Sequence, residues 1–111
     1  MIISTLRRKT TVTEAAEWEQ RSAALLGRLR PFLERQAGFV SHELRREGEG
    51  GAMAEVTRWR GADELRAYLR NGAAATAATM LDAAFPTAPY PNGTWVRENH
   101  EESGVRSPES G

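Results

Sequence analysis

Apolar and polar residues alternate along this chain with two different periods, which predict both strands and helices. Four short segments rich in apolar or β-branched residues, bounded by charged residues or glycine, are typical of strands: 1–8, 39–46, 52–60 and 94–100. Apolar residues recur at helical spacing in three further segments: 18–33, 65–69 and 73–85. Taking the last two segments as one helical region, the predicted order is β-α-β-β-α-β.

Local signals indicate where these elements begin and end. Thr11 followed by Glu14 predicts a capping box that starts the first helix, and Pro31 predicts a kink or a split within it. Gly38 is placed to take the left-handed conformation after that helix. The sequence GEGG at 48–51 supplies positive φ for a hairpin turn, and 71–72 (Asn-Gly) predicts a helix stop or hinge.

This order is typical of a ferredoxin-like α+β sandwich, in which helices cover one side of a four-stranded antiparallel sheet. Apolar neighbours such as Ile2 and Ile3 point to opposite faces of a strand, and so do the pairs at 39–40 and 95–96. The helices cover one face only, so the other face would expose apolar area. We therefore expect a homodimer that buries it. One domain is expected over 1–100, followed by a disordered tail at 101–111.

Composition excludes several classes of function. Fifteen basic and fifteen acidic residues cancel, so nucleic acid and membrane surfaces are not expected partners. The chain has no cysteine, which excludes disulfides and thiol chemistry. Its histidines and carboxylates lack metal-ligand spacing, and no glycine-rich phosphate loop opens a helix, so neither metal nor cofactor is expected. Without a membrane span or a signal-like start, a cytoplasmic protein is expected.

The order of elements, the A-G-F after the first helix, the strand ending E-V-T-R-W-R and the helix D-E-L-R-A-Y-L together resemble the antibiotic biosynthesis monooxygenase family. The resemblance spans roughly residues 1–100 and implies a dimeric α+β barrel with one pocket per subunit between helices and sheet. It also implies oxidation of polycyclic aromatic phenols or anthrones by molecular oxygen, with no metal or flavin. The substrate supplies the electrons, while the protein desolvates, orients and deprotonates it.

The chain departs from two branches of this family. A quinone-forming branch has asparagine four residues before the strand-end tryptophan, and the matching residue here is Glu55. A carboxylate can accept a proton where an amide cannot, so Glu55 is a candidate base. A haem-degrading branch has a first-strand asparagine and a second-helix histidine that this chain lacks, which argues against haem degradation.

The strand period places Glu55 and Trp59 on one face with Met53 and Thr57. On that face desolvation would raise the pKa of the glutamate; the alternative is that Glu55 pairs with an arginine such as Arg97. Candidate catalytic residues are Glu55, Trp59 and Tyr68, whose hydroxyl would donate to a substrate oxygen or point outward. Candidate substrate-binding residues include a possible lid of Met80, Phe85 and Tyr90. The full set is Trp18, His42, Met53, Thr57, Met80, Phe85, Tyr90 and Arg97.

His42 is expected on the same side of its strand as Val40 and Leu44, where a structural role is more common than a catalytic one. The leading hypothesis is a cofactor-independent monooxygenase with a small hydrophobic aromatic substrate and oxygen. One alternative is cyclase or isomerase chemistry with Glu55 as acid and base. Another is a non-catalytic dimer that binds a ligand or supports a partner enzyme.

Overall fold

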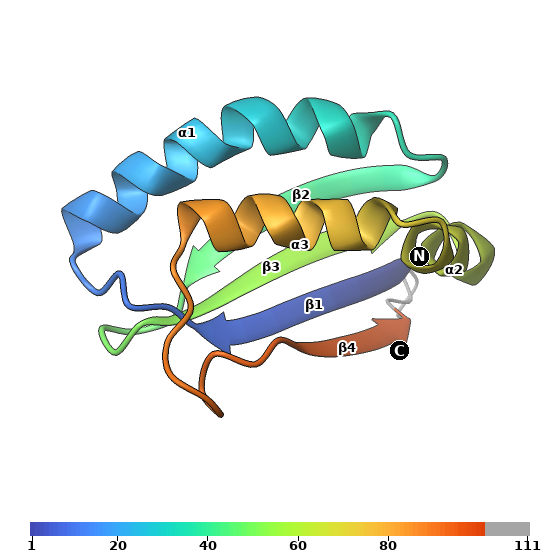
Figure 1. The fold of residues 1–111 in the computed structure, drawn as a ribbon. Coiled ribbons are helices and arrows are strands. Elements are labelled where there is room, and N and C mark those ends of the chain that lie inside the picture. Colours follow the sequence, from blue (N-terminus) through green and yellow to red (C-terminus); the bar gives the residue numbers. More distant parts are fainter. Residues whose placement is uncertain (102–111) are drawn as a thin grey trace, which may run out of the picture.

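The computed structural model describes residues 1–101 and contains one four-stranded antiparallel sheet with three helices (Figure 1). The strands are β1 (Ile2–Lys9), β2 (Phe39–Arg46), β3 (Ala52–Trp59) and β4 (Val96–Glu101). The helices are α1 (Ala15–Glu34), α2 (Ala62–Arg70) and α3 (Ala73–Ala84). The strand order across the sheet is β2-β3-β1-β4, so β1 and β3 are central and β2 and β4 are edges. This confirms the predicted α+β ferredoxin-like fold.

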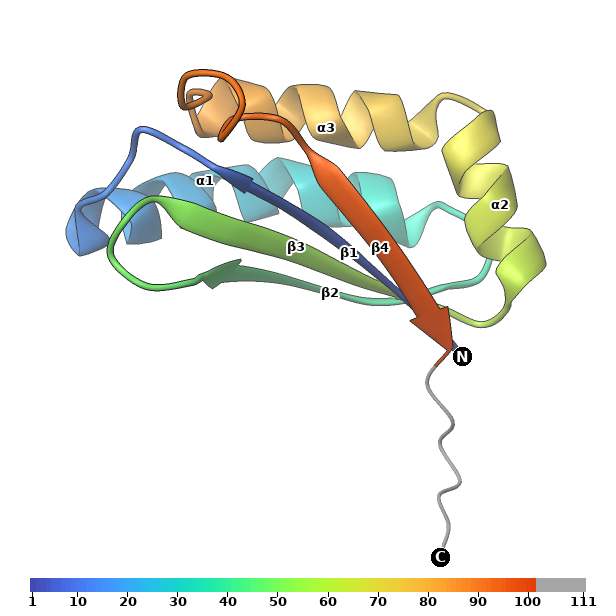
Figure 2. The same cartoon turned by 90° about the horizontal axis from the view of Figure 1, so that it is seen from below.

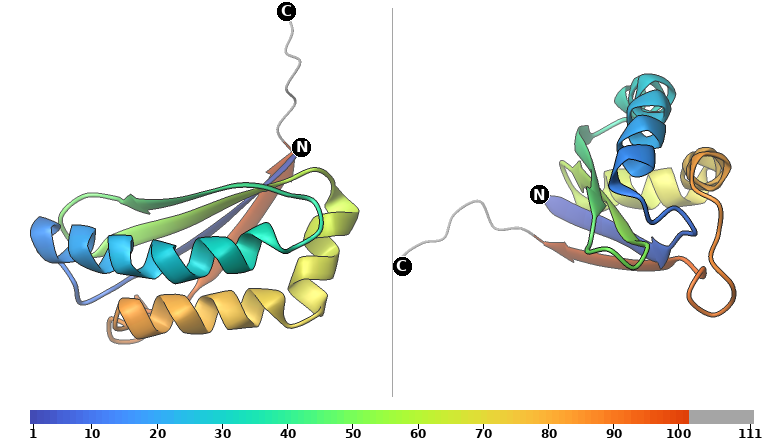
Figure 3. Two further views of the ribbon diagram at one scale, coloured as in Figure 1. Left: turned by 90° about the horizontal axis from the view of Figure 1, so that it is seen from above. Right: turned by 90° about the vertical axis from the view of Figure 1, so that its left-hand side faces the viewer.

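The helices pack on one face of the sheet and leave the opposite face uncovered. α1 and α3 run side by side over the strands, and α2 crosses one end (Figures 2 and 3). The core between these layers comes from alternate strand positions and the inner faces of the helices. Its largest fully buried apolar side chains are Trp59, Tyr68, Phe85, Leu25, Leu29, Leu33, Met53 and Leu81.

The predicted glycine turns are confirmed. Gly38 has φ of +79° after α1, and Gly48 and Gly51 have φ of +87° and +88° in the β2–β3 hairpin. Gly72, with φ of +89°, separates α2 from α3, so the second helical region forms two helices with different directions. Left-handed backbone is accessible to glycine at little cost, which explains its use at these reversals.

The start of α1 differs from the prediction. α1 begins at Ala15, and its N-cap residue Glu14 makes no side-chain capping bond, so Thr11 and Glu14 form no capping box. The backbone of Thr11 instead donates a hydrogen bond to the carbonyl of Pro86 at 3.1 Å, which holds it in the connection from β1. Pro31 does not split the helix, because it lies in the last turn, where few backbone bonds follow it.

Differences at the other end of the chain are small. β4 begins at Val96 and includes Glu101, which had been assigned to the tail, while the rest of the predicted tail, 102–111, lies outside the described residues. Among the described helices, none is long and apolar enough to cross a membrane.

The uncovered sheet face is less apolar than the sequence suggested. Ile3 and Val56 point to this face yet are only 7% and 1% exposed, because they sit on central strands between long neighbours. The charged rim includes the ion pairs of Arg7 with Glu47 and Glu98. The exposed apolar side chains of this face are Val40 (43%) and Val96 (57%), one on each edge strand.

The hairpin glycines provide a test of the fold. A Cβ on Gly51 would overlap the carbonyl oxygen of Thr10, whereas one on Gly48 meets nothing within 4 Å, although both have φ near +88°. We predict that Gly48→Ala costs about 1 kcal/mol of unfolding free energy, the cost of left-handed backbone for alanine. Gly51→Ala should cost about 1–3 kcal/mol more, because backbone must shift. Urea unfolding of both variants measures this, and equal costs would contradict it.

Candidate active site

A row of polar side chains crosses the helix-facing side of the sheet. Strand register places Glu55 of β3 and Arg97 of β4 on either side of Leu6, so all three face the helices. Ser4 of β1 and Thr57 of β3 are register partners one step along, and both are 1% exposed. Polar groups buried this deeply need partners, because burial without a hydrogen bond is costly.

Glu55 and His42 form a buried pair. The distance between Glu55 Oε2 and His42 Nε2 is 3.0 Å, and the two side chains are 2% and 0% exposed. The hydrogen bond joins neighbouring strands, since β2 lies next to β3, whereas β1 separates β3 from Arg97 on β4. The sequence-based alternative of a Glu55–Arg97 pair is therefore wrong. A carboxylate hydrogen-bonded to imidazole in a water-excluded layer is suited to accept and hold a proton.

Leu44 lies on the inner side with His42, as expected, but the other expected companion, Val40, does not. The register between β2 and β3 shifts between Phe39 and Ser41, which marks an irregularity at Val40. Phe39 therefore joins His42 on the inner side, while Val40 is exposed on the outside. A strict two-residue period cannot reveal such a shift.

Tyr68 lies above this layer on α2. It is 2% exposed, and within residues 1–101 its hydroxyl has no hydrogen-bond partner. Burial raises the pKa of the Tyr68 phenol, the nearby negative charge of Glu55 raises it further, and Arg97 opposes the shift. The phenol is thus a neutral donor at physiological pH, within electrostatic range of both charged groups.

Trp59 is part of the closed core in this structure. It is 0% exposed, its indole Nε1 donates to Thr57 Oγ1 at 2.9 Å, and its ring lies 4.5 Å from that of Tyr68. Phe39 meets it edge-on at 5.7 Å. Trp59 therefore fixes α2, and with it Tyr68, against the end of β3. Met53 is likewise 0% exposed.

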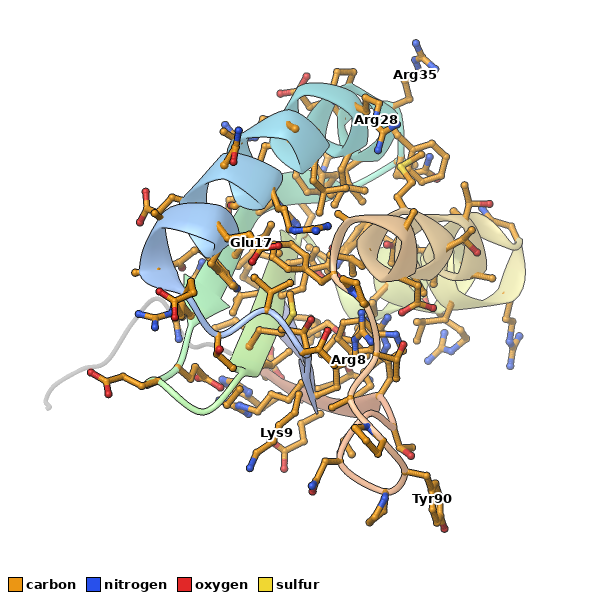
Figure 4. All side chains as sticks on the ribbon, turned by 60° about the vertical axis from the view of Figure 1, so that its left-hand side comes forward. Arg8, Lys9, Glu17, Arg28, Arg35 and Tyr90 are labelled. Carbon is orange, nitrogen blue, oxygen red and sulfur yellow. The ribbon has the colours of Figure 1, made fainter. Side chains whose placement is uncertain are left out.

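The remaining predicted residues divide between the core and the surface. Trp18 and Phe85 pack against each other with ring centroids 5.5 Å apart, and Met80 packs against the same core. Tyr90 is 88% exposed at the tip of the α3–β4 loop and points away from the interior (Figure 4). The structure therefore does not bring Tyr90 to the other predicted site residues.

Arg8 is a structural residue that the sequence analysis missed. Its side chain enters the interior beside the α3–β4 loop (Figure 4) and pairs with Asp82 at 3.0 Å. Its nitrogens also donate to the Phe85 carbonyl and Thr87 Oγ1, and its guanidinium stacks on Trp95 at 4.3 Å. Burial lowers the pKa of Arg8, and the charge of Asp82 opposes this. The loop is thus anchored as a fixed wall. Strand alternation could have predicted this inward direction, because Arg8 is two residues after the inward-facing Leu6 on β1.

Three of the cavities formed by residues 1–101 lie around this interior. One of about 320 Å³ lies between α2 and the ends of β1 and β4, and its lining includes Ile2, Leu65 and Asn99. A second, of about 470 Å³, lies beside the β2–β3 hairpin and the α3–β4 loop. A third, of about 380 Å³, lies at the junction of α1 with α2 and α3. None of the three is lined by Glu55 or Trp59.

Comparison with known proteins gives the same architecture. No family model and no curated protein matches this sequence. A mutant of SnoaB, a cofactor-independent oxygenase from Streptomyces nogalater, is 25% identical, with 97% of this chain and 98% of that chain covered and a TM-score of 0.59. The monooxygenase of the gene ActVA-Orf6 from Streptomyces coelicolor, in complex with nanaomycin D, is 16% identical, with coverages of 97% and 92% and a TM-score of 0.65.

A third structure is named as an antibiotic biosynthesis monooxygenase from Bordetella bronchiseptica. It is 16% identical, with 92% of this chain and 96% of that chain covered and a TM-score of 0.62. The chain has the fold of the antibiotic biosynthesis monooxygenases. The resemblance expected from the strand-end tryptophan and the following helix thus extends to the whole described domain. Within this monooxygenase fold, the buried Glu55–His42 pair occupies the position where the resemblance implied an amide.

The ionisation of Tyr68 tests its placement in this monooxygenase fold. The chain has two tyrosines, so Tyr90→Phe leaves Tyr68 as the single phenol. We predict that phenolate absorbance in this variant rises well above pH 10, the usual value, whereas in guanidinium it rises near pH 10. Above about pH 10 the unfolded chain loses a proton that the folded protein keeps, so stability falls as pH rises further. Native titration near pH 10 would place Tyr68 in solvent.

Proposed function

We propose that this protein is a cofactor-independent oxygenase that oxidises a small aromatic hydroxy or keto compound with molecular oxygen. The observation that carries this proposal is the buried Glu55–His42 pair beside the neutral hydroxyl of Tyr68. The similarity to named oxygenases supports the oxygen chemistry. Their substrates are not carried over, and the substrate class is argued from the groups of the site.

The chemistry begins with proton transfer. Glu55 accepts a proton from an acidic C–H or O–H of the substrate, and His42 holds the carboxylate in position and shares the proton. The resulting carbanion or phenolate passes one electron to dioxygen, and the two radicals combine as a peroxide. Loss of water from that peroxide leaves a carbonyl, so a methylene and O₂ give a ketone and H₂O. The substrate supplies the electrons in this sequence.

The energetic cost of the pair favours a functional role. A buried carboxylate and imidazole contribute less stability than apolar side chains of the same volume would, because both lose hydration. The unpartnered hydroxyl of Tyr68 and the unpartnered Nδ1 of His42, among the described residues, add to that cost. A bound ligand that supplied partners to this layer would offset it.

Two alternatives are each favoured by one observation. The carboxylate at Glu55, where a related branch has an amide, favours proton transfer without oxygen, as in a cyclase or isomerase. The close packing of Trp59 and Met53, both 0% exposed, favours a non-catalytic dimer that binds a ligand or supports a partner enzyme. The Glu55 experiment below separates all three.

We also propose that the protein is a homodimer formed by the uncovered sheet face. This face carries exposed Val40 and Val96 on its edges, with charges of both signs between them. A surface with both signs of charge can pair with a copy of itself about a two-fold axis. Burying the two valines would remove the exposed apolar side chains of this face from water.

Glu55→Gln tests the base. We predict that wild-type protein consumes oxygen when it converts anthrone to anthraquinone, and that Glu55→Gln lowers the rate roughly a hundredfold or more. Glu19→Gln is the control, because Glu19 is an exposed glutamate of α1, on the helical side of the molecule and away from the sheet face proposed for the dimer. An oxygen electrode and quinone absorbance measure both rates, and thermal unfolding checks that each variant is folded.

The possible outcomes separate the three functions. Conversion of a related hydroxy ketone without oxygen uptake would replace the oxygenase with an acid–base isomerase or cyclase. Equal rates for wild type and Glu55→Gln, under conditions where both are folded, would favour the non-catalytic dimer.

Sedimentation tests the dimer. We predict that the wild type sediments at twice the 12.3 kDa mass of one chain. Val96→Asp should shift it toward the monomer at micromolar concentration, because burying an unpaired carboxylate is costly. Ala75→Asp, at an exposed position of α3 on the helical side, should leave the dimer intact. A wild-type monomer at these concentrations would refute the assembly.

A further inference from the structure

The chain contains three asparagines, and glycine follows two of them, at 71–72 and 92–93. The backbone nitrogen that follows an asparagine can attack the carbonyl carbon of its side chain, which expels ammonia and closes a five-membered imide. Glycine in the following position favours this reaction, because it has no Cβ to shield the nitrogen and its backbone rotates freely. The sequence therefore contains two candidate sites of spontaneous deamidation, and the structure separates them.

The Asn92–Gly93 pair is held closed by its surroundings. Gly93 is buried, and its N–H donates to the carbonyl of Pro89 at 3.3 Å. The N–H of Asn92 donates to the same carbonyl at 3.0 Å, and the carbonyl of Asn92 accepts from the N–H of Lys9 at 2.9 Å. A Cβ on Gly93 would overlap the carbonyl oxygen of Ala88, so this glycine is closely packed. Ring closure at Asn92 therefore requires local opening of the α3–β4 loop.

The Asn71–Gly72 pair lies in the open. Both residues are exposed and form the two-residue joint between α2 and α3, at a corner of the helical layer (Figures 2 and 3). A Cβ on Gly72 would meet nothing within 4 Å, and the N–H of Gly72 donates to no carbonyl among residues 1–101. The attacking nitrogen is thus neither covered by neighbouring atoms nor engaged in a backbone hydrogen bond. The corner also stays accessible if a second copy covers the sheet face.

The side chain of Asn71 folds back over the joint. Its Oδ1 accepts a hydrogen bond from the N–H of Ala73 at 2.9 Å, which closes a local turn around Gly72. Ring closure requires rotation about the Cα–C bond of Asn71, whose ψ is 8°. The rotation costs this one hydrogen bond, and the open space around Gly72 accommodates it. Asn71 therefore meets a smaller obstacle than Asn92, where packed backbone must first separate.

We propose that Asn71 is a site of spontaneous deamidation in the folded protein and that the fold protects Asn92. The nitrogen of Gly72 forms a bond to Cγ of Asn71 and loses its proton, while the bond from Cγ to the amide nitrogen breaks and ammonia leaves. Water then opens the imide. Attack of water at Cγ leaves aspartate, and attack at the backbone carbonyl carbon leaves isoaspartate. Water is the co-reactant, and no atom is oxidised or reduced.

Both products change the start of α3. Aspartate at this position places a negative charge beside the N–H of Ala73, at the end of the helix where the macrodipole is positive, so it should cap α3 at least as well as the amide. Isoaspartate adds one methylene to the backbone of a two-residue joint, so α2 and α3 must change their relative position. Because α2 carries Tyr68, isoaspartate would also disturb the contact of Tyr68 with Trp59.

Ageing of the full chain, followed by digestion, tests this proposal. The folded protein is kept in mildly alkaline buffer at 37 °C, and samples are digested with a protease that cleaves before aspartate. The chain has two aspartates, Asp63 and Asp82, so Asn71 and Asn92 fall in different peptides. Deamidation adds one mass unit to a peptide, and new cleavage before position 71 distinguishes aspartate from isoaspartate, which resists the protease. We predict at least about tenfold faster deamidation at Asn71 than at Asn92.

Three controls identify the cause. In guanidinium, where the fold is lost, the two asparagines should deamidate at rates within about threefold of each other, because glycine follows both. Asn71→Gln should leave the peptide 63–81 unmodified, since glutamine would have to close a six-membered ring. Thermal unfolding of Asn71→Asp should occur at the wild-type temperature or above it. The isoaspartate fraction of aged wild type, separated by ion exchange, should unfold at a lower temperature.

Equal rates at the two asparagines in the folded protein, or faster reaction at Asn92, would overturn the proposal. So would a folded chain that stays unmodified at Asn71 while the denatured chain reacts. An isoaspartate fraction as stable as fresh protein would contradict the effect on α2. Both rates come from one sample, so incomplete folding lowers their ratio and does not imitate the predicted result. The readout is independent of oxygenase activity and of assembly.

Discussion

The hydrogen bond between Glu55 and His42 is the interaction on which the proposed chemistry depends. It exists because two adjacent strands each turn a polar side chain toward the helices at neighbouring positions. Removing one partner of a buried pair of this kind typically costs about 3–5 kcal/mol, since the other group stays buried without compensation. The pair therefore constrains the register of the β2–β3 hairpin as well as the chemistry of the interior.

The surrounding packing holds that pair at a fixed distance from its neighbours. Trp59 stands between Phe39 and Tyr68, so the position of α2 is tied to the end of β3. At the other end of the sheet Arg8 ties the α3–β4 loop to β1 through an ion pair, hydrogen bonds and an aromatic stack. The interior is thus held by these contacts at both ends, and a cavity of about 320 Å³ lies at the corner between α2 and β4.

Sequence alone predicted the fold well, because hydrophobic period and glycine position are local signals. Gly38 and Gly51 take the backbone that their positions required, and Glu55 faces the side that strand alternation assigned to it. The partner of Glu55 was not predicted, since it depends on the exact register of the β2–β3 hairpin, which puts Leu44 opposite Glu55 and His42 at the next inward position. Strand alternation could have placed Arg8 inward, but its partners lie more than seventy residues away in sequence, where periodicity carries no information.

One short helix carries two different functions of the proposed site. Leu65 forms a wall of the corner cavity, and Tyr68 presents its hydroxyl to the polar layer, both from α2. α2 has Gly61 at its start and Gly72 just after its end, and its nine residues form one continuous helix. The width of the cavity and the position of the phenol are consequently coupled: a molecule that pushed Leu65 outward would also draw Tyr68 away from its contact with Trp59.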